Sequence, residues 1–379
     1  MSALEARAAQ HRTSARLELH QERRRKEALK RQKDARSDRS NRFRALEPEP
    51  QIEVDQQLTK AQRKKQRAFD EARQRAERWS GELCSYDWLC DIPDDLNGTN
   101  TSEGWFCMPR PEGRRVVLVA SKGKVDTRQT SGDRLHQFTC DCLPGGSTRT
   151  KHKPQTILDC VFVEHSSTYI ITDCMCWGGY DLYTCAAEFR FYWLRTKLAE
   201  CQQEACDEDE FKLEVAPYFD CDRQGLAKAY RAPLPYLRDG LLFYHKQGHY
   251  ACGHTSLVCL FKDEECTRRF NADSSGDLIA ALKVIGTHAA TVDGVSFPII
   301  GESLEEPLVE GELARFVVVA SNDSVCVRAE RRCSPKRAVA DCASKIAFFL
   351  RRRAGGGLRF NDLWVRSAGP ANESFMLSN

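Results

Sequence analysis

The chain has 379 residues, with 57 Lys/Arg, 54 Asp/Glu and a formal net charge of +3 at pH 7. Residues 1–80 carry 22 Lys/Arg and 13 Asp/Glu, a net charge of +9, whereas the remaining residues carry 35 and 41, a net charge of −6. No run of about 18 apolar residues occurs, and the first residues lack the apolar core of a secretory signal, so we expect neither a membrane span nor secretion. The composition predicts a basic arm on an acidic body, in the reducing cytosol or nucleus.

Residues 1–80 contain no glycine and only two prolines, and they are predicted to form two helices. The first helix covers about residues 6–46 and ends at Glu-Pro-Glu-Pro (47–50), because the residue before a proline disfavours the α region. The second begins at Thr59, where Thr-Lys-Ala-Gln forms a capping-box pattern, and ends near Trp79. With only three aromatic side chains, this segment cannot bury itself. We interpret it as a charged arm that a partner holds.

Two kinds of partner fit the arm. A nucleic acid fits because phosphate neutralisation needs only an extended basic rod. A concave acidic protein that wraps a basic helix also fits. Acidic residues lie among the basic ones, including Glu22, Glu27 and Asp34, and these would repel phosphates. The residues therefore favour a protein partner over a nucleic acid.

From Gly81 onward the composition changes to that of a mixed α+β fold. Strand-like apolar runs occur at residues 116–121, 157–163, 169–174, 241–245, 257–261 and 316–320. A helix is predicted over residues 184–202, with Phe189, Tyr192 and Trp193 on one face and Arg190 largely on the other.

Three further segments complete the body. Residues 143–153, which begin with Leu-Pro-Gly-Gly, are predicted to form an exposed basic connector. The pattern of residues 338–353 predicts an amphipathic helix near the C-terminus, and about the last 20 residues are predicted to form a C-terminal tail.

The 18 cysteines are scattered, and the closest pairs are spaced C-x-C at Cys140/Cys142 and Cys174/Cys176. No C-x-x-C occurs, so we interpret these residues as buried free thiols in apolar strands. His249, Cys252 and His254 lie close together, but no second ligand pair follows at zinc-finger spacing. We therefore predict no metal site.

Arg110-Pro-Glu112-Gly113-Arg114-Arg115 precedes a strong strand and resembles K-x-D-G-x-R, the nucleotidyl-transfer motif of capping enzymes and ligases. There a lysine amine attacks the α-phosphate, which requires a nitrogen that can lose its proton. The Arg110 guanidinium stays protonated, so covalent catalysis by this residue is excluded. Asp239-Gly240, with Arg238 before it, resembles a later strand motif of the same superfamily. The two motifs predict a guanine-nucleotide pocket retained for binding, with no catalytic residue.

Longer blocks resemble the snurportin family. They are T-I-L-D-C-V-F-V-E through F-R-F-Y-W-L-R-T-K-L (156–198), D-W-L-C-D-I-P-D-D-L (87–96), L-P-G-G (143–146) and D-G-L-L-F-Y-H-K-Q-G-H-Y (239–250). The blocks stand in family order over residues 81–262, and the sequence beyond about residue 265 is not covered. In the arm, E-R-R-R-K-E-A-L-K-R-Q-K-D-A-R resembles the family's importin-β-binding helix.

The resemblance implies a non-catalytic nuclear import adaptor that needs no cofactor. Its body would bind the trimethylguanosine cap of spliceosomal small nuclear RNAs, in a mixed or antiparallel α+β fold similar to the nucleotide-binding domain of mRNA guanylyltransferases. Its arm would bind importin-β, and an exportin would return it, so it would shuttle between nucleus and cytoplasm. The implied division is residues 1–50 as the importin-β-binding arm, 51–80 as a helical linker, 81–335 as the cap-binding domain and 336–379 as a C-terminal helix and tail.

The resemblance also implies functional residues. In the cap site, Trp88, Gly113, Arg114 and Arg115 match family positions. The expected lysine becomes Thr130, with Arg128 as a candidate replacement charge, and the stacking tryptophan becomes Leu260, with Tyr86 as a candidate replacement ring. The importin-β-binding residues are Arg23, Arg24, Arg25, Lys26, Lys30, Arg31, Lys33 and Arg36.

Leu260 leaves two alternatives open. Loss of an aromatic platform costs about 1–3 kcal/mol per base, so the site could be weak or tuned to a different cap. The chain could also be an importin-β adaptor or RNA-binding protein that has lost cap recognition. An active guanylyltransferase-like enzyme is a further alternative, against which Arg110 argues.

Overall fold

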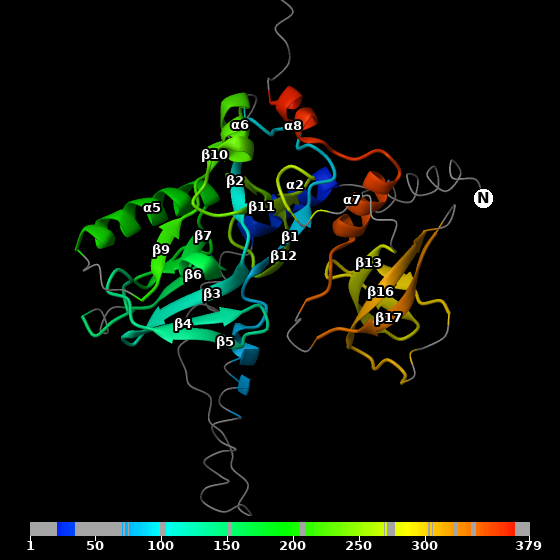
Figure 1. Cartoon of the computed structure of the whole chain (residues 1–379), viewed down its shortest axis with the longest axis horizontal. Coiled ribbons are helices and arrows are strands. Elements are labelled where there is room, and N and C mark those ends of the chain that lie inside the picture. The colour runs from blue at the N-terminus through cyan, green and yellow to red at the C-terminus, as the bar shows by residue number, and fades with distance from the viewer. Residues whose placement is uncertain are drawn as a thin grey trace, which may run out of the picture.

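The computed structural model describes residues 21–34, 70, 73–74, 76–98, 104–149, 154–204, 210–268, 270, 277–301, 304, 306–320, 324–334 and 339–367. The fold is α+β, as predicted, and contains three mainly antiparallel sheets with helices around them (Figure 1). In this part of the chain, no helix is both long and apolar enough to cross a membrane. Nor do any three of its His, Cys, Asp or Glu side chains group together as metal ligands would.

The first sheet has the strand order β1-β12-β11-β2-β10. The strands are β1 (Cys84–Trp88), β12 (Gly253–Phe261), β11 (Arg238–His245), β2 (Trp105–Pro111) and β10 (Phe219–Asp220). β1 runs parallel to β12, and the other pairs are antiparallel. Alternate side chains enter different cores: Cys259 and Phe261 pack on one face, and Val258 and Leu260 pack on the other. The two faces of β12 therefore contact different parts of the chain.

The second sheet has the order β5-β4-β3-β6-β7-β8, with β9 beside β7. Its strands are β3 (Arg114–Ser121), β4 (Lys124–Gln129), β5 (Arg134–Phe138), β6 (Thr156–Val163), β7 (Thr168–Trp177), β8 (Tyr180–Asp181) and β9 (Lys212–Val215), with the short helix η1 (Glu164–Ser166) between β6 and β7. Every residue of β6 and β7 is buried. That burial explains why both strands are mostly apolar in sequence.

Helix α5 (Ala187–Glu204) contacts β7, close to its predicted bounds. Phe189 and Tyr192 lie on a different face from Arg190, as predicted, and the structure adds that the Arg190 face is the buried one. Arg190 is 1% exposed, whereas Phe189 and Tyr192 are 43% and 59% exposed. The reason is Asp173 on β7, whose buried carboxylate accepts two hydrogen bonds of 2.8 Å from the Arg190 guanidinium. Arg190 therefore lies among the buried apolar residues of α5, such as Phe191 and Leu194, because Asp173 neutralises its charge.

The prediction that the connector is exposed is wrong for residues 143–147, which are buried. The turn packs on the end of β3: Gly123 donates its backbone N–H to Gly145, and Thr156 donates its hydroxyl to the Pro144 carbonyl. Residues 148–149 are exposed, and residues 150–153 lie outside the described part of the chain. The four cysteines of the C-x-C pairs are buried thiols, as predicted.

The third sheet has the order β15-β14-β13-β16-β17. Its strands are β13 (Ile279–Ile285), β14 (His288–Ala290), β15 (Ser296–Pro298), β16 (Leu313–Ala320) and β17 (Val325–Arg332). Each of the six predicted strands thus lies at one of β3, β6, β7, β11, β12 and β16. Helix α7 (Ala343–Arg353) buries Ile346 and Leu350 against this sheet and confirms the predicted late helix.

The prediction of a C-terminal tail is wrong in part, because helix α8 (Phe360–Arg366) forms within the last 20 residues. The ring of Phe360 stacks on Tyr230 of α6 (Arg223–Arg231) with the centroids 3.7 Å apart. Stacking of two aromatic rings explains why this short segment is ordered on the body.

One helix of the basic arm is described. Helix α2 (Gln21–Asp34) lies within the first predicted helix and contacts β12 (Figure 1). Of the second predicted helix, residues 70, 73–74 and 76–79 are helical. The rest of both predictions falls outside the described residues.

Candidate nucleotide-binding site

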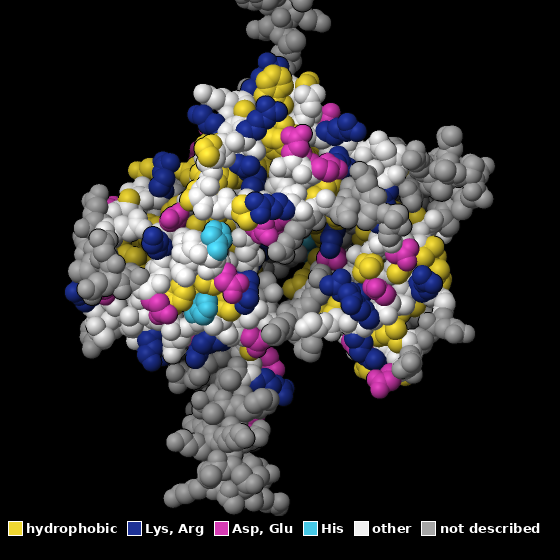
Figure 2. Space-filling model, in the orientation of Figure 1, with side chains coloured by type: hydrophobic (Ala, Val, Ile, Leu, Met, Phe, Trp, Pro, Cys, Tyr) yellow, Lys and Arg dark blue, Asp and Glu magenta, His cyan; other side chains and the backbone are white. Residues whose placement is uncertain are grey.

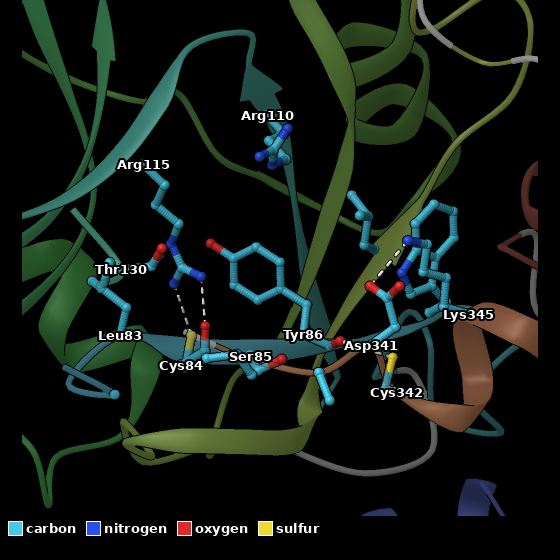
Figure 3. A pocket seen from close by; sticks show the side chains of 15 residues that line it. Leu83, Cys84, Ser85, Tyr86, Arg110, Arg115, Thr130, Asp341, Cys342 and Lys345 are labelled. Atoms are coloured by element: carbon cyan, nitrogen blue, oxygen red, sulfur yellow. Dashed lines mark hydrogen bonds and ion pairs between the residues drawn. The ribbon is translucent and has the colours of Figure 1, made fainter. Parts of the chain in front are cut away.

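A cavity of 340 Å³ lies where the first two sheets meet the segment that leads into α7 (Figure 3). On the face shown in Figure 2, the surface is hollowed between the main body and the third sheet. The predicted residues that line the cavity are Tyr86, Trp88, Arg115, Thr130 and Leu260. Four of these lie on strands, where backbone pairing holds them in place, and Thr130 follows β4.

Tyr86 and Arg115 form one unit at the cavity wall. The Arg115 guanidinium lies 4.1 Å from the centroid of the Tyr86 ring, which places a cation over an aromatic face. Its Nε donates to Asp159 Oδ1 at 3.0 Å, and a second nitrogen donates to Cys84 O. Tyr250 also donates its hydroxyl to Asp159, at 2.9 Å. Because Asp159 already pairs with Arg115, the arginine acts first as a support that holds Tyr86 in position.

Burial and neighbouring charges together shift the pKa values of Arg115, Tyr86 and Cys84. Burial by itself would lower the pKa of Arg115, but the Asp159 carboxylate raises it well above its ordinary value. Burial also raises the pKa of the Tyr86 hydroxyl, and that of the Cys84 thiol to about 11. Arg115 is therefore charged at neutral pH, and Tyr86 presents a neutral aromatic ring.

Trp88 and Leu260 form the adjoining wall. They are paired in the β1–β12 register, and Leu260 is 7% exposed. The Trp88 ring also packs on α7, with centroid distances of 5.0 Å to Phe348 and 5.2 Å to Phe349. Phe261 points to the opposite face, as strand geometry predicts. It therefore cannot replace the missing stacking ring at residue 260.

The third wall was missed by the sequence analysis. It consists of residues 339–342 and Lys345, just before and within the first turn of α7. Lys345 Nζ lies 3.0 Å from Asp341 Oδ1, and Asp341 Oδ2 accepts the Ala281 N–H. The i,i+4 spacing of Asp341 and Lys345 is common on helices, so it gave no signal that these residues close a cavity.

Three predicted cap-site residues are not in the cavity lining. A Cβ at Gly113 would lie 2.3 Å from the Phe162 carbonyl oxygen, so this glycine serves the close approach of β6. Arg114 is exposed and lies 3.4 Å from Glu164. Arg128 is buried and donates to the Gly132 carbonyl at 3.0 Å. Gly113 and Arg128 serve the local fold, and none of the three residues lines this cavity.

The two nucleotidyl-transfer-like motifs do meet in space. Arg110 pairs with Asp239, which also accepts hydrogen bonds from Lys262 and Thr267. Arg110 reaches the cavity lining, so the position of the nucleophilic lysine faces the site. Burial would raise the pKa of Asp239, but the positive charges of Arg110 and Lys262 outweigh that effect and lower it.

Asp239→Asn is expected to lower the free energy of unfolding at neutral pH by about 1–2 kcal/mol, because two cations lose their anionic partner and some solvent contact moderates the loss. A carboxyl with a depressed pKa stabilises the fold above its unfolded value of about 4 and loses that effect as the pH falls through the folded value. The difference between the two proteins should therefore shrink below about pH 4. Urea unfolding at a series of pH values measures it, and a constant difference would contradict the ionic role.

The predicted importin-β-binding residues are only partly exposed. Arg23, Lys26, Lys30 and Arg31 are exposed on α2, whereas Arg24 is half-buried and Arg25 is 2% exposed. Lys33 lies in α2, and Arg36 is outside the described residues.

Comparison with known proteins gives one family match. Residues 82–263 match the family described as Snurportin1, m3G cap-binding domain. Among solved structures, a mycobacterial DNA ligase D complexed with ATP and MES is 13% identical, with 70% of this chain and 99% of that chain covered and a TM-score of 0.34. The ligase domain of M. tuberculosis LigD is 13% identical over 69% and 98%, with a TM-score of 0.33. The Chlorella virus DNA ligase-adenylate is 10% identical over 67% and 98%, with a TM-score of 0.30.

Proposed function

Because residues 82–263 belong to the Snurportin1 m3G cap-binding domain family, we propose that this protein is a nuclear import adaptor that binds the trimethylguanosine cap of spliceosomal small nuclear RNA particles and links them to importin-β. The observation that carries the proposal is the cavity in which Tyr86 and Trp88 meet within the family-matched region. A methylated, cationic guanine gains from an aromatic face, so this cavity suits that base.

The charges around the cavity support the same ligand. Asp159 offsets the positive charge of Arg115, and the Asp341 carboxylate lies in the opposite wall (Figure 3). Lys345 and Arg110, although paired with carboxylates, place N–H donors at the lining, where the phosphates of a cap could accept hydrogen bonds. The cavity thus offers both rings for the base and cations for the phosphates.

The adaptor binds without catalysis. Covalent nucleotidyl transfer needs an amine that can lose its proton, and Arg110 stands in its place. Importin-β would bind the basic arm, with an affinity that falls as salt rises, because the contact is mostly between charges. An exportin would return the protein from nucleus to cytoplasm after the RNA is released.

Leu260→Trp is expected to tighten binding of a trimethylated cap analogue by about 1–3 kcal/mol, or about 5–150-fold, because it adds an aromatic platform at the wall. Fluorescence or calorimetric titration with trimethylated, monomethylated and unmethylated analogues measures the change. Leu260→Met is the matched control, since it keeps an apolar side chain but adds no ring.

The same titration distinguishes the proposed function from the main alternative, an adaptor that has lost cap recognition. Leu260, in place of the expected tryptophan, favours that alternative. Preference of the native chain for the trimethylated analogue supports the proposed function. Equal or absent binding of all three analogues supports the alternative. If Leu260→Trp leaves all three affinities unchanged, the placement of the base beside residue 260 is wrong.

A further inference from the structure

The basic helix α2 is seated on the body of its own chain, on the reverse side of the sheet from the cavity. Arg25 is 2% exposed, lies over the Trp105 ring at 5.4 Å and donates to Cys259 Sγ at 3.9 Å. Cys259 and Trp105 belong to the core on the face of β12 opposite Leu260. A ligand in the cavity and a helix in this seat can therefore be present together.

Two uncharged side chains attach the ends of α2. Gln21 is 2% exposed; its Nε2 donates to Trp88 O at 2.8 Å, and its Oε1 accepts the Asp91 N–H at 3.2 Å. Gln32 is 8% exposed; its Nε2 donates to Gln247 O at 2.8 Å, and its Oε1 accepts the His249 N–H at 2.9 Å. Each glutamine thus satisfies backbone groups of the body with both ends of its amide.

Arg24 adds an ionic contact between these two points. Its guanidinium lies 3.0 Å from Asp87, which is fully buried, and 3.1 Å from Asp293. Asp293 also accepts the Ala343 N–H at the start of α7. Gln21, Arg25 and Gln32 fall on one helical face at about 100° per residue. Arg23, Lys26, Lys30 and Arg31 lie on the opposite, exposed face.

We infer that the body masks the importin-β-binding arm, and that importin-β must displace α2 from this seat to enclose the helix. The inference rests on the proposed importin-β partner. A receptor that wraps the helix needs the face that now holds Arg24 and Arg25, so seat and receptor compete for the same side chains. The apparent affinity is then reduced by the fraction of molecules in which α2 is free.

The test is importin-β binding to the full chain carrying Gln21→Ala together with Gln32→Ala. These changes remove the four glutamine hydrogen bonds to the body's backbone, which weakens the attachment of α2, and they leave every charge of the arm in place. We expect importin-β to bind about tenfold more tightly than to the native chain. Hydrogen exchange on the same protein should show faster exchange of the α2 amides and unchanged exchange in β6 and β7, which establishes that the body is folded.

The matched control changes the exposed face, with Lys26→Ala together with Arg31→Ala. It should weaken importin-β binding and leave α2 exchange as in the native chain. Equal or weaker binding by the glutamine variant while its α2 amides exchange faster would overturn the mask. So would tighter binding with unchanged α2 exchange. If neither the native chain nor the glutamine variant binds importin-β, the proposed import function fails, whatever α2 does.

Discussion

Arg190→Ala is expected to lower the free energy of unfolding by about 3–5 kcal/mol, because it leaves the buried Asp173 carboxylate without its cation. Arg190 also donates to the Gly248 carbonyl at 2.9 Å and to the Cys185 carbonyl, so the substitution removes a side-chain link between α5, β7 and the loop after β11. Urea unfolding measures the loss.

The pH dependence of this variant has a defined sign. Burial already raises the pKa of Asp173, more than the neighbouring Arg190 charge lowers it. Without Arg190 the folded state holds the proton over a wider pH range than the unfolded state, so stability falls as pH rises. The loss should therefore be smaller near about pH 5 than near about pH 8.

Lys197→Ala is the control, because it breaks an ion pair with Glu200 on the exposed side of the same helix. It should leave the free energy of unfolding essentially unchanged. Replacing Arg190 and Asp173 together by leucine should recover part of the loss. Equal effects of Arg190→Ala and Lys197→Ala would contradict the structural role of the buried pair.

Tyr86→Ala is expected to weaken binding of the trimethylated cap analogue by about 1–3 kcal/mol, which is about 5–150-fold. The substitution removes the ring that Arg115 holds at the cavity wall. Tyr86→Phe keeps that ring and should bind close to the native level. Equilibrium titration of the three proteins with one analogue measures the effect.

Tyr192→Ala serves as a second control, since this ring is 59% exposed on α5 and does not line the cavity. It should leave cap-analogue binding unchanged. If Tyr86→Phe loses as much affinity as Tyr86→Ala, the phenol oxygen rather than the ring carries the contact. If Tyr86→Ala binds normally while the protein is folded, the base is bound elsewhere.

Much of the framework could be predicted from the sequence because it depends on local pattern. The runs that became β6 and β7 are mostly apolar, with buried Asp159 and Asp173 as exceptions, because both faces of these strands are buried. The degenerate motif likewise excluded Arg110 itself as a covalent nucleophile without any coordinates, since a guanidinium does not lose its proton.

The walls of the cavity could be predicted only in part. Tyr86, Trp88, Arg115, Thr130 and Leu260 were found through family resemblance, and the structure brings them together. Gly113, Arg114 and Arg128 came from the same reasoning, yet side-chain direction and nearby partners take them away from the cavity. Residue spacing alone does not distinguish the two groups.

Composition and periodicity therefore determined the basic arm, the principal strands and the absence of a lysine nucleophile, because each depends on residues near one another in the chain. Only the tertiary structure decided that α5 buries Arg190, that residues 339–345 close the cavity and that α2 rests on β12. Each of these depends on a partner far away in sequence, such as Asp173 for Arg190 or the backbone of Trp88 for Gln21. Distant partners leave no period in a sequence, so no local pattern could reveal them.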